Sequence, residues 1–463
     1  MKISPTAEER KKILALAKDL ERKVTVSAKK KRVDAVVRVE GSVAKDTWLK
    51  EEPDIDVFMC LSPTIPRKTL GAVSLEIARE ATDGWRQVER FAEHPYLEAF
   101  VEGYRVNIVP CYCAGKGEWL SATDRTPFHT DYVNKRLDSS LRCEVRLLKR
   151  FLQGIRAYGA EIKVGGFSGY LCELLVIHFG SFTETLQNFA KCAARMVIDV
   201  ENYYTGRERE LRLLFDEPLV VVDPVDKGRN VASAVKPQKI HVMIAAARAF
   251  LKTPSEHFFF PPKTEALSAK DLKENLKQRG SDCLFLTFRN VNAVPDILWG
   301  QLYKTQRSLR KLLELNGFKV LRDVAWSDEE NLSAFVFELE QFMIPNIKKH
   351  LGPPLEREEE CKNFLSKYVT NDNVVSGPFM EDGRWVVEVP RKYTDVVELL
   401  QETLKEGGRA AGVADFVSEA FKDGFKILVN GEVSEVYLDN NAFANFLTEF
   451  LDGRPFWLKP EET

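Results

Sequence analysis

The sequence predicts an α+β protein built from several domains, and three observations carry this prediction. The chain has 463 residues, and at roughly 100–200 residues per domain this length indicates two to four domains. Strands alternate with helices in the first third, helices dominate the middle, and a β-α-β-β order opens the last third. The composition, 44% hydrophobic and 29% charged, supplies enough apolar residues for several cores.

The first third begins with a charged amphipathic helix over residues 7–29. Strands are predicted over residues 35–40, 54–61 and 104–110, with a helix over residues 67–81 between the second and third strands. We expect these elements to form one mixed α/β domain, residues 1–142.

The middle of the chain is helical from about residue 143 to residue 200, with breaks at glycines 165, 166 and 180. A short apolar strand is bracketed by prolines 218 and 224, and a helix is predicted over residues 238–251. Prolines 254, 261 and 262 then indicate a boundary. We assign residues 143–255 to a mainly helical central domain.

The last third contains a strand over residues 284–289, a helix over 296–315, and strands over 318–326 and 333–340. This order is typical of a ferredoxin-like or RRM-like unit, which we place at residues 256–350. The Gly352-Pro353-Pro354 break then separates a predicted tail, residues 351–463, with a strand over 384–389.

The charge and hydropathy of the chain limit which partners and which location are possible for the protein. The formal net charge is −2, so a nucleic acid would have to be held by local basic patches. No uncharged apolar run approaches the ~20 residues that span a bilayer, and residues 1–12 lack the apolar stretch of a signal peptide. We expect a cytoplasmic protein with no membrane partner. The scattered cysteines lack a C-x-x-C pair and are expected to be reduced and mostly buried.

The most informative segment is Gly41-Ser42, followed after eleven residues by Asp54-Ile55-Asp56. Gly41 allows a close approach of the backbone to a phosphate, which the Ser42 hydroxyl can also bind. Residues two apart on a strand share a face, so the two aspartates should project together, roughly 7 Å apart. Crowded carboxylates repel unless a cation lies between them, and Mg²⁺ combines one or two carboxylates with phosphates. An exposed strand face is the alternative, but the preceding Gly-Ser favours a metal site.

This segment resembles the signature of polymerase-β-type nucleotidyltransferases, and in particular that of archaeal (class I) CCA-adding enzymes. Further blocks follow in the family's order at residues 92–96, 109–112, 124–129, 144–149, 158–161, 166–174, 222–226 and 229–232. The resemblance covers residues 35–235 and is looser in the C-terminal half. It implies a polymerase-β-like nucleotidyltransferase head, a helical central domain, and addition of C, C and A to the 3′ end of tRNA from CTP and ATP.

The resemblance also implies roles for individual residues. Asp54 and Asp56 would hold Mg²⁺, while Ser42 and Lys45 would contact the triphosphate. Lys45 stands where the family also has arginine, so the cation is kept but the bidentate fork is lost. The further residues implied are His129, Lys149 and Tyr158 for the ATP/CTP pocket and Arg229 for the base edge. Taken alone, each of them could be an ordinary surface or core residue, and only their joint occurrence in the family's order favours a pocket.

One position departs from the family. A third carboxylate is expected on the strand before Val109-Pro-Cys-Tyr112, where this chain has Asn107. Its amide oxygen can complete the metal site, but it supplies neither charge nor a base. Three interpretations stay open: catalysis with two acids, Asn107 and water; substitution by a nearby acid, Glu102 or Asp124; or tRNA and nucleotide binding with poor catalysis.

The resemblance implies that the C-terminal regions hold the acceptor stem and elbow of tRNA, and it suggests a homodimer. A poly(A) polymerase or oligoadenylate synthetase would share the Gly-Ser and Asp-x-Asp core, although residues 125–129 and 223–226 favour a CCA-adding enzyme. Basic clusters could contact phosphate or be solvated faces. These clusters are Lys304, Arg307, Arg310 and Lys311; Lys348-Lys349-His350; and Arg391-Lys392.

Overall fold

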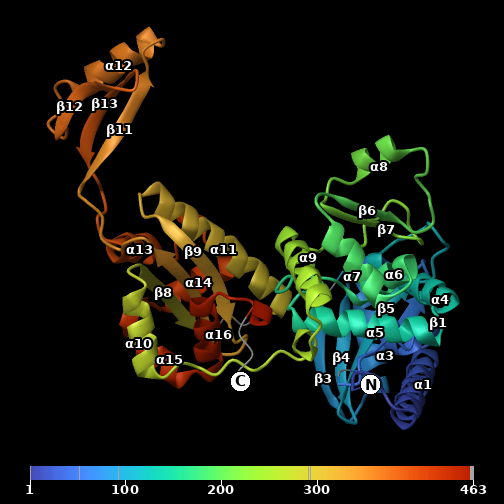
Figure 1. Ribbon diagram of the computed structural model, residues 1–463. Helices are drawn as coiled ribbons and strands as arrows, with labels where there is room; N and C mark the ends of the chain where they lie inside the picture. The colour runs from blue at the N-terminus through green and yellow to red at the C-terminus, as the bar shows by residue number, and fades with distance from the viewer. Residues whose placement is uncertain (1, 52, 92, 290, 292, 459–463) are drawn as a thin grey trace. The chain divides into compact units, whose positions relative to one another are not determined.

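The computed structural model describes residues 2–51, 53–91, 93–289, 291 and 293–458. The chain divides into two compact units, Met1–Pro262 with Pro455–Thr463, and Lys263–Arg454 (Figure 1). Ala92, in the motif block 92–96, and residues 459–463 of the predicted tail lie outside the described residues.

The first unit opens with a five-stranded sheet in the order β1-β2-β5-β4-β3. Strands β2 and β5 are parallel and the other neighbours are antiparallel, so the predicted mixed sheet is confirmed. The β3–β4 hairpin was not predicted. The strands are β1 (Ala35–Glu40), β2 (Ile55–Leu61), β3 (Arg86–Phe91), β4 (Pro95–Val101) and β5 (Tyr104–Tyr112).

One face of this sheet packs on helices α1 (Ala7–Lys30) and α3 (Arg67–Ala81). Ile55, Val57 and Met59 of β2 point into that core. Because side chains alternate along a strand, Asp56 points to the opposite face. The site therefore lies on the face away from α1 and α3.

Four helices build most of the core after the head, and the predicted helical middle is confirmed. They are α5 (Ser139–Gly154), α6 (Gly169–Phe179), α7 (Phe182–Lys191) and α9 (Pro237–Lys252). A parallel pair, β6 (Met196–Asp199) and β7 (Leu219–Val222), accompanies them, and only β7 was predicted. Helix α4 (Thr126–Arg136) comes just before α5 and contacts both β1 and α6. No described helix is long and apolar enough to cross a membrane.

The second unit contains an antiparallel four-stranded sheet in the order β14-β8-β10-β9. Helices pack on both of its faces, α11, α13 and α14 on one, and α10, α15 and α16 on the other. The predicted ferredoxin-like region is confirmed, with β14 as the fourth strand. The strands are β8 (Asp282–Arg289), β9 (Val320–Ser327), β10 (Leu332–Leu339) and β14 (Phe425–Val429). The helices are α10 (Ala269–Gln278), α11 (Pro295–Leu315), α13 (Val396–Leu404), α14 (Asp415–Asp423), α15 (Ser434–Asp439) and α16 (Asn441–Asp452).

A second, three-stranded sheet is inserted between β10 and α13. It consists of β11 (Ile347–Pro354), β12 (Ser376–Glu381) and β13 (Arg384–Pro390), with helix α12 (Glu358–Tyr368) against it. The predicted boundary between residues 350 and 351 falls inside β11, and β14 from the predicted tail pairs with β8. Strand pairing therefore does not separate a tail at residue 351, because the four-stranded sheet of the second unit includes β14, which lies after that residue. The other domain limits stay predictions.

Candidate active site

Asp56 and Asn107 lie side by side at the centre of the head sheet. They are directly paired across β2 and β5, and the Asn107 side-chain amide donates to Asp56 Oδ1 at 2.9 Å. Gly41 begins the short helix α2 (Gly41–Ala44) with φ +71°, and a Cβ there would meet Asp56 Oδ2 at 2.1 Å. Any side chain at Gly41 would have to adopt a left-handed backbone and displace the Asp56 carboxylate. The predicted phosphate-binding turn thus lies against a predicted metal ligand.

Asp54 lies just before β2 and is held by Arg105 at the start of β5. Arg105 Nε donates to Asp54 Oδ1 at 2.7 Å, and a second guanidinium nitrogen contacts the other oxygen. Burial, and to a lesser degree the charge of Asp54, raises the pKa of Asp56 to about 6, although the Asn107 amide opposes the shift. A cation bound beside Asp56 would oppose both effects, because it favours the ionised carboxylate.

These residues fit a divalent cation that arrives with phosphates. Asp56 is a crowded carboxylate whose ionised form a cation would stabilise, and Mg²⁺ prefers such oxygens. Arg105 adds a positive charge beside Asp54, and Asn107 contributes no negative charge. Within the described ranges, no three His, Cys, Asp or Glu side chains gather into a metal-binding set. The remaining ligands would have to come from the nucleotide and water.

The structure also places the two acids that could substitute for Asn107. Asp124 is buried and accepts hydrogen bonds from the backbone amides of Tyr112, Leu120 and Ser121. Its carboxylate therefore caps the short 3₁₀ helix Ala122–Arg125 and is already engaged. Glu102 lies in the exposed turn between β4 and β5. Neither acid is paired with Asp56, which leaves Asn107 beside it.

Lys45 and Lys149 meet at one buried carboxylate, that of Glu173 on α6. Lys45 Nζ donates to Glu173 Oε2 at 2.6 Å, and Lys149 Nζ lies 3.6 Å from Glu173 Oε1. Thr47 completes the cluster, because its hydroxyl donates to Glu173 Oε1 at 2.6 Å. Lys149 also donates to the Thr47 backbone oxygen at 3.0 Å. The loop after α2 is thus attached to both α5 and α6.

Arg146 on α5 holds the same loop from the other side. Its side chain is 1% exposed, and its Nε donates to the Trp48 backbone oxygen at 3.0 Å. A second guanidinium nitrogen donates to Asp46 Oδ1 at 2.6 Å. Arg146 and Lys149 are three residues apart, so both point from one face of α5. Two cations therefore bind the carbonyls of three consecutive loop residues.

His129 and Arg229 converge on Asp223, which follows β7 and is fully buried. His129 Nε2 lies 2.9 Å from Asp223 Oδ2, and Arg229 donates to the same oxygen at 2.7 Å. Burial alone would raise the pKa of Asp223, but His129 and Arg229 hold it at about 2. Tyr170 stacks on His129, with ring centroids 4.1 Å apart, and donates to Asp223 Oδ1. Lys45 Nζ lies 5.6 Å from the Tyr170 ring, so the lysine and histidine clusters adjoin.

Ser42 and Tyr158 complete the predicted set. Ser42 is half-buried on α2, next to Gly41. A Cβ built on Gly169, at the start of α6, would lie 3.2 Å from the Tyr158 hydroxyl and 3.4 Å from Lys149 Nζ. Tyr158 and Lys149 therefore point at the same turn of α6. All the predicted residues lie in the first unit, but their contacts with substrate stay predictions.

Sequence reasoning missed the partners that organise these residues. Four such residues lie within the blocks that resemble the family, but no role was predicted for them: Arg146, Tyr170, Glu173 and Asp223. A signal existed for Glu173, because it is the only charge in the apolar run of residues 170–177. A helix that is apolar all round is buried, and a buried charge needs a partner.

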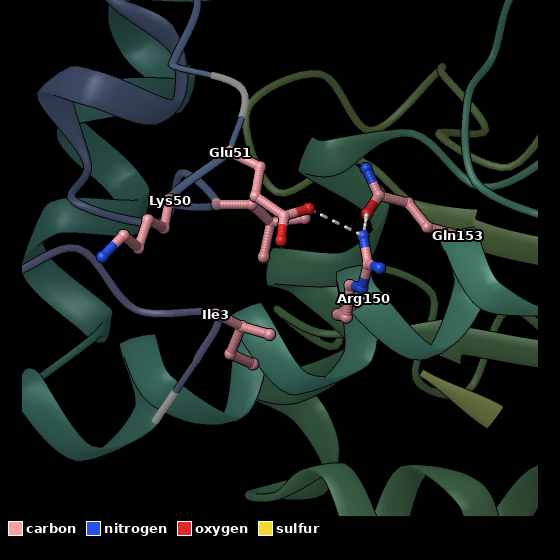
Figure 2. A pocket seen from close by; sticks show the side chains of 6 residues that line it. Ile3, Lys50, Glu51, Arg150 and Gln153 are labelled. Atoms are coloured by element: carbon pink, nitrogen blue, oxygen red, sulfur yellow. Dashed lines mark hydrogen bonds and ion pairs between the residues drawn. The ribbon is translucent and has the colours of Figure 1, made fainter. Parts of the chain in front are cut away.

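A small hollow elsewhere in the first unit is not part of this site. Ile3, Lys50, Glu51, Arg150 and Gln153 surround it, with Arg150 donating to Glu51 and Gln153 (Figure 2). Its volume of about 10 Å³ suits one water molecule rather than a nucleotide.

A mixed sheet that sets a carboxylate against a glycine turn, with buried cations beside it, is the arrangement expected of a nucleotidyltransferase. Residues 21–129 match the model of the nucleotidyltransferase domain, and residues 143–260 that of the tRNA nucleotidyltransferase second domain. Residues 279–430 match the C-terminal domain of CCA-adding enzymes. The chain belongs to the family of CCA-adding enzymes.

Three relatives illustrate this membership. The CCA-adding enzyme of Methanosarcina barkeri is 37% identical over 93% of this chain and 93% of its own length. That of Methanosarcina mazei is 36% identical over 97% of this chain and 96% of its own. That of Haloarcula marismortui is 34% identical over 98% of this chain and 97% of its own. The similarity thus extends through the second unit, where the sequence motifs were looser.

Proposed function

We propose that this protein adds C, C and A to the 3′ end of tRNA, using CTP and ATP and releasing pyrophosphate. The observation that carries the proposal is the contact of Gly41 with Asp56, beside Asn107 and within a family of CCA-adding enzymes. In this reaction the 3′ oxygen of the tRNA bonds to the α-phosphorus, and the bond to the pyrophosphate oxygen breaks. We also propose that it acts in the cytoplasm.

Asp54 and Asp56 would hold Mg²⁺, which when bound activates the 3′ hydroxyl and stabilises the leaving pyrophosphate. Ser42 and the α2 amides would bind phosphate oxygens, and Lys45 and Lys149 would neutralise their charge. Asn107 orients Asp56 but cannot accept the proton of the 3′ hydroxyl. We propose that this proton passes to water, so catalysis proceeds with two acids.

His129 and Tyr158 would line the nucleotide pocket, and Arg229 would face the base edge. Asp223 supports this proposal, because it fixes His129 and Arg229 on one carboxylate. We further propose that the second unit holds the acceptor stem and elbow of tRNA through phosphate and shape rather than sequence, and that two copies assemble as a homodimer.

The experiment is to incubate the protein with tRNA lacking its 3′ CCA, Mg²⁺ and nucleoside triphosphates supplied singly and then together. We expect two C residues with CTP alone, and one further A when ATP is added. Long A tails would instead support a poly(A) polymerase, and binding without extension a non-catalytic tRNA-binding protein. Asn107→Asp separates the interpretations of that position. An inactive wild type beside an active Asn107→Asp variant would refute catalysis with two acids.

A further inference from the structure

We infer that Glu173 is a positioning residue for nucleotide binding: it fixes Lys45 and Lys149 as a charged pair beside the loop that follows the predicted phosphate-binding turn. The inference rests on the proposed function, since it concerns the same site. Glu173 itself is fully buried and does not face solvent.

The carboxylate of Glu173 is fully engaged. One oxygen accepts from Lys45 at 2.6 Å, and the other from the Thr47 hydroxyl at 2.6 Å, with Lys149 Nζ at 3.6 Å. These partners come from two segments, the loop after α2 and helix α5. A single side chain on α6 thus sets the spacing of two cations that are distant in sequence.

Electrostatics explains why a carboxylate is needed at this place. Two ammonium groups that approach one buried point repel each other, and burial favours their neutral forms. Burial already lowers the pKa of Lys149, Lys45 lowers it further, and Glu173 opposes the shift. Among the described residues, Cys172 and Tyr158 also lie near Lys149. Without the charge of Glu173, Lys149 would lose its proton at a lower pH.

The donors of Lys149 are also accounted for. Its ammonium donates to the Thr47 backbone oxygen at 3.0 Å and to the Thr47 hydroxyl at 3.1 Å, with Glu173 in a third direction. Lys149 thus holds the loop that carries Lys45, and Glu173 completes that arrangement. The carboxylate acts through the two lysines, not through contact with the reacting atoms.

Glu173→Gln tests the inference, because it keeps the size of the side chain and removes its charge. We expect the Kd for CTP with Mg²⁺ to rise at least about tenfold, since charge-assisted hydrogen bonds to both lysines are lost. The alkaline limb of kcat/KM for CTP should move to lower pH, because Lys149 deprotonates earlier. The Kd for tRNA should stay unchanged.

Glu144→Gln is the matched control. Glu144 lies on the same helix as Lys149 and accepts from the Phe182 amide at 2.8 Å, away from the carboxylate that Lys45 and Lys149 share. We expect it to change thermal stability but neither CTP affinity nor the alkaline limb. If Glu173→Gln behaves as Glu144→Gln does, Glu173 is structural only and the inference fails.

Thr47→Val covers the case in which Glu173→Gln does not fold. It removes a hydroxyl that contacts both Glu173 and Lys149 and changes no charge. CTP affinity should fall, as in Glu173→Gln, but by a smaller factor. An affinity equal to that of the wild type would overturn the inference. CTP binding is measured without tRNA, so it does not depend on the proposed function. If the wild type binds CTP but does not extend tRNA, the proposed function is refuted, and the CTP affinities of the variants still test the role of Glu173.

Discussion

Single residues decide whether the head can hold a metal-bound nucleotide. Gly41 and Asp56 were predicted from their spacing, because strand periodicity and glycine's freedom are local properties. Their direct contact was not predicted, nor was the ion pair of Asp54 with Arg105. The first depends on the antiparallel pairing of β1 with β2, where Glu40 lies opposite Asp56. The second depends on the parallel pairing of β2 with β5, which joins segments about fifty residues apart and which no local pattern encodes.

Gly41→Ala should abolish most activity while costing little stability. The left-handed backbone costs an alanine about 1 kcal/mol, and its Cβ would also displace the Asp56 carboxylate. Gly84→Ala is the control, since Gly84 has φ +85° and nothing within 4 Å of an added Cβ. Both variants should unfold at similar denaturant concentrations, but only Gly41→Ala should lose about 100-fold in kcat for CTP addition. Equal activities would contradict the contact.

Arg105→Gln should lower the Mg²⁺ concentration required for half-maximal activity. The guanidinium occupies both oxygens of Asp54 and adds positive charge where a cation would bind. Arg86→Gln removes another arginine of the same sheet, which lies over the Phe100 ring and contacts neither aspartate. The measurement is initial rate against Mg²⁺, and an unchanged or higher requirement in Arg105→Gln would refute competition between Arg105 and the metal.

At the scale of elements, the strongly periodic segments were predicted well and the irregular strands were missed. Helices α1, α3, α9 and α11 follow clear apolar periodicities. Strand β3 has no buried residue, and β11 is mostly exposed and ends in two prolines. Exposed edge strands carry little hydrophobic alternation, and proline argues against a strand, so the sequence signal was weak.

Glu338 ties the end of α16 to β10, and its loss should destabilise the second unit. It is 4% exposed and accepts from Arg279 at 2.8 Å and Arg322 at 2.7 Å, while both arginines also donate to carbonyls at the end of α16. Glu338→Gln should cost about 3 kcal/mol, because it leaves two partly buried arginines without their anion. The control Glu340→Gln removes an exposed pair with Lys319 and should cost under about 0.5 kcal/mol. Chemical unfolding at neutral pH measures both.

The same carboxylate predicts a pH dependence. Burial would raise the pKa of Glu338, but Arg279, Ser281 and Arg322 hold it at about 2, below the ordinary 4.5. A carboxyl group whose pKa is lower in the folded than in the unfolded state stabilises the fold at pH values above its unfolded-state pKa. This contribution is lost as the pH falls toward the folded-state pKa. The stability difference between wild type and Glu338→Gln should therefore shrink between pH 4.5 and pH 2. A difference that grows on acidification would contradict this assignment.

At the scale of the molecule, the net charge of −2 does not favour RNA binding, so contacts with RNA phosphates would have to come from local basic patches. The predicted cluster on α11 divides in the structure. Arg310 is engaged by Asp323 and Glu314, whereas Lys304, Arg307 and Lys311 are exposed. Their spacing of three and four residues puts them on one helix face. We expect these three to contact phosphate, and Arg310 to be structural.

Replacing Lys304, Arg307 and Lys311 by Gln should weaken tRNA binding and reduce its dependence on salt. Each lost phosphate contact lowers the slope of log K against log[salt] by about 0.7–0.9, so the triple variant should change it by about 2–3. The matched control replaces Lys270, Lys273 and Lys277, which are exposed on α10 with the same spacing. Binding titrations across salt concentrations give both slopes. Equal changes in the two triple variants would contradict the prediction that these three residues of α11 contact phosphate.

The strand order of the second unit has a consequence for biosynthesis. Phe288 of β8 pairs with Phe425 of β14, so on a translating ribosome the edge of β8 that faces away from β10 waits for its partner for roughly 7–27 s at 5–20 residues per second. During that interval β8 presents an open edge, which invites pairing with other nascent chains. Chains that terminate before Phe425 would keep that edge permanently, and we expect them to be captured by chaperones or to aggregate rather than accumulate as a stable fragment.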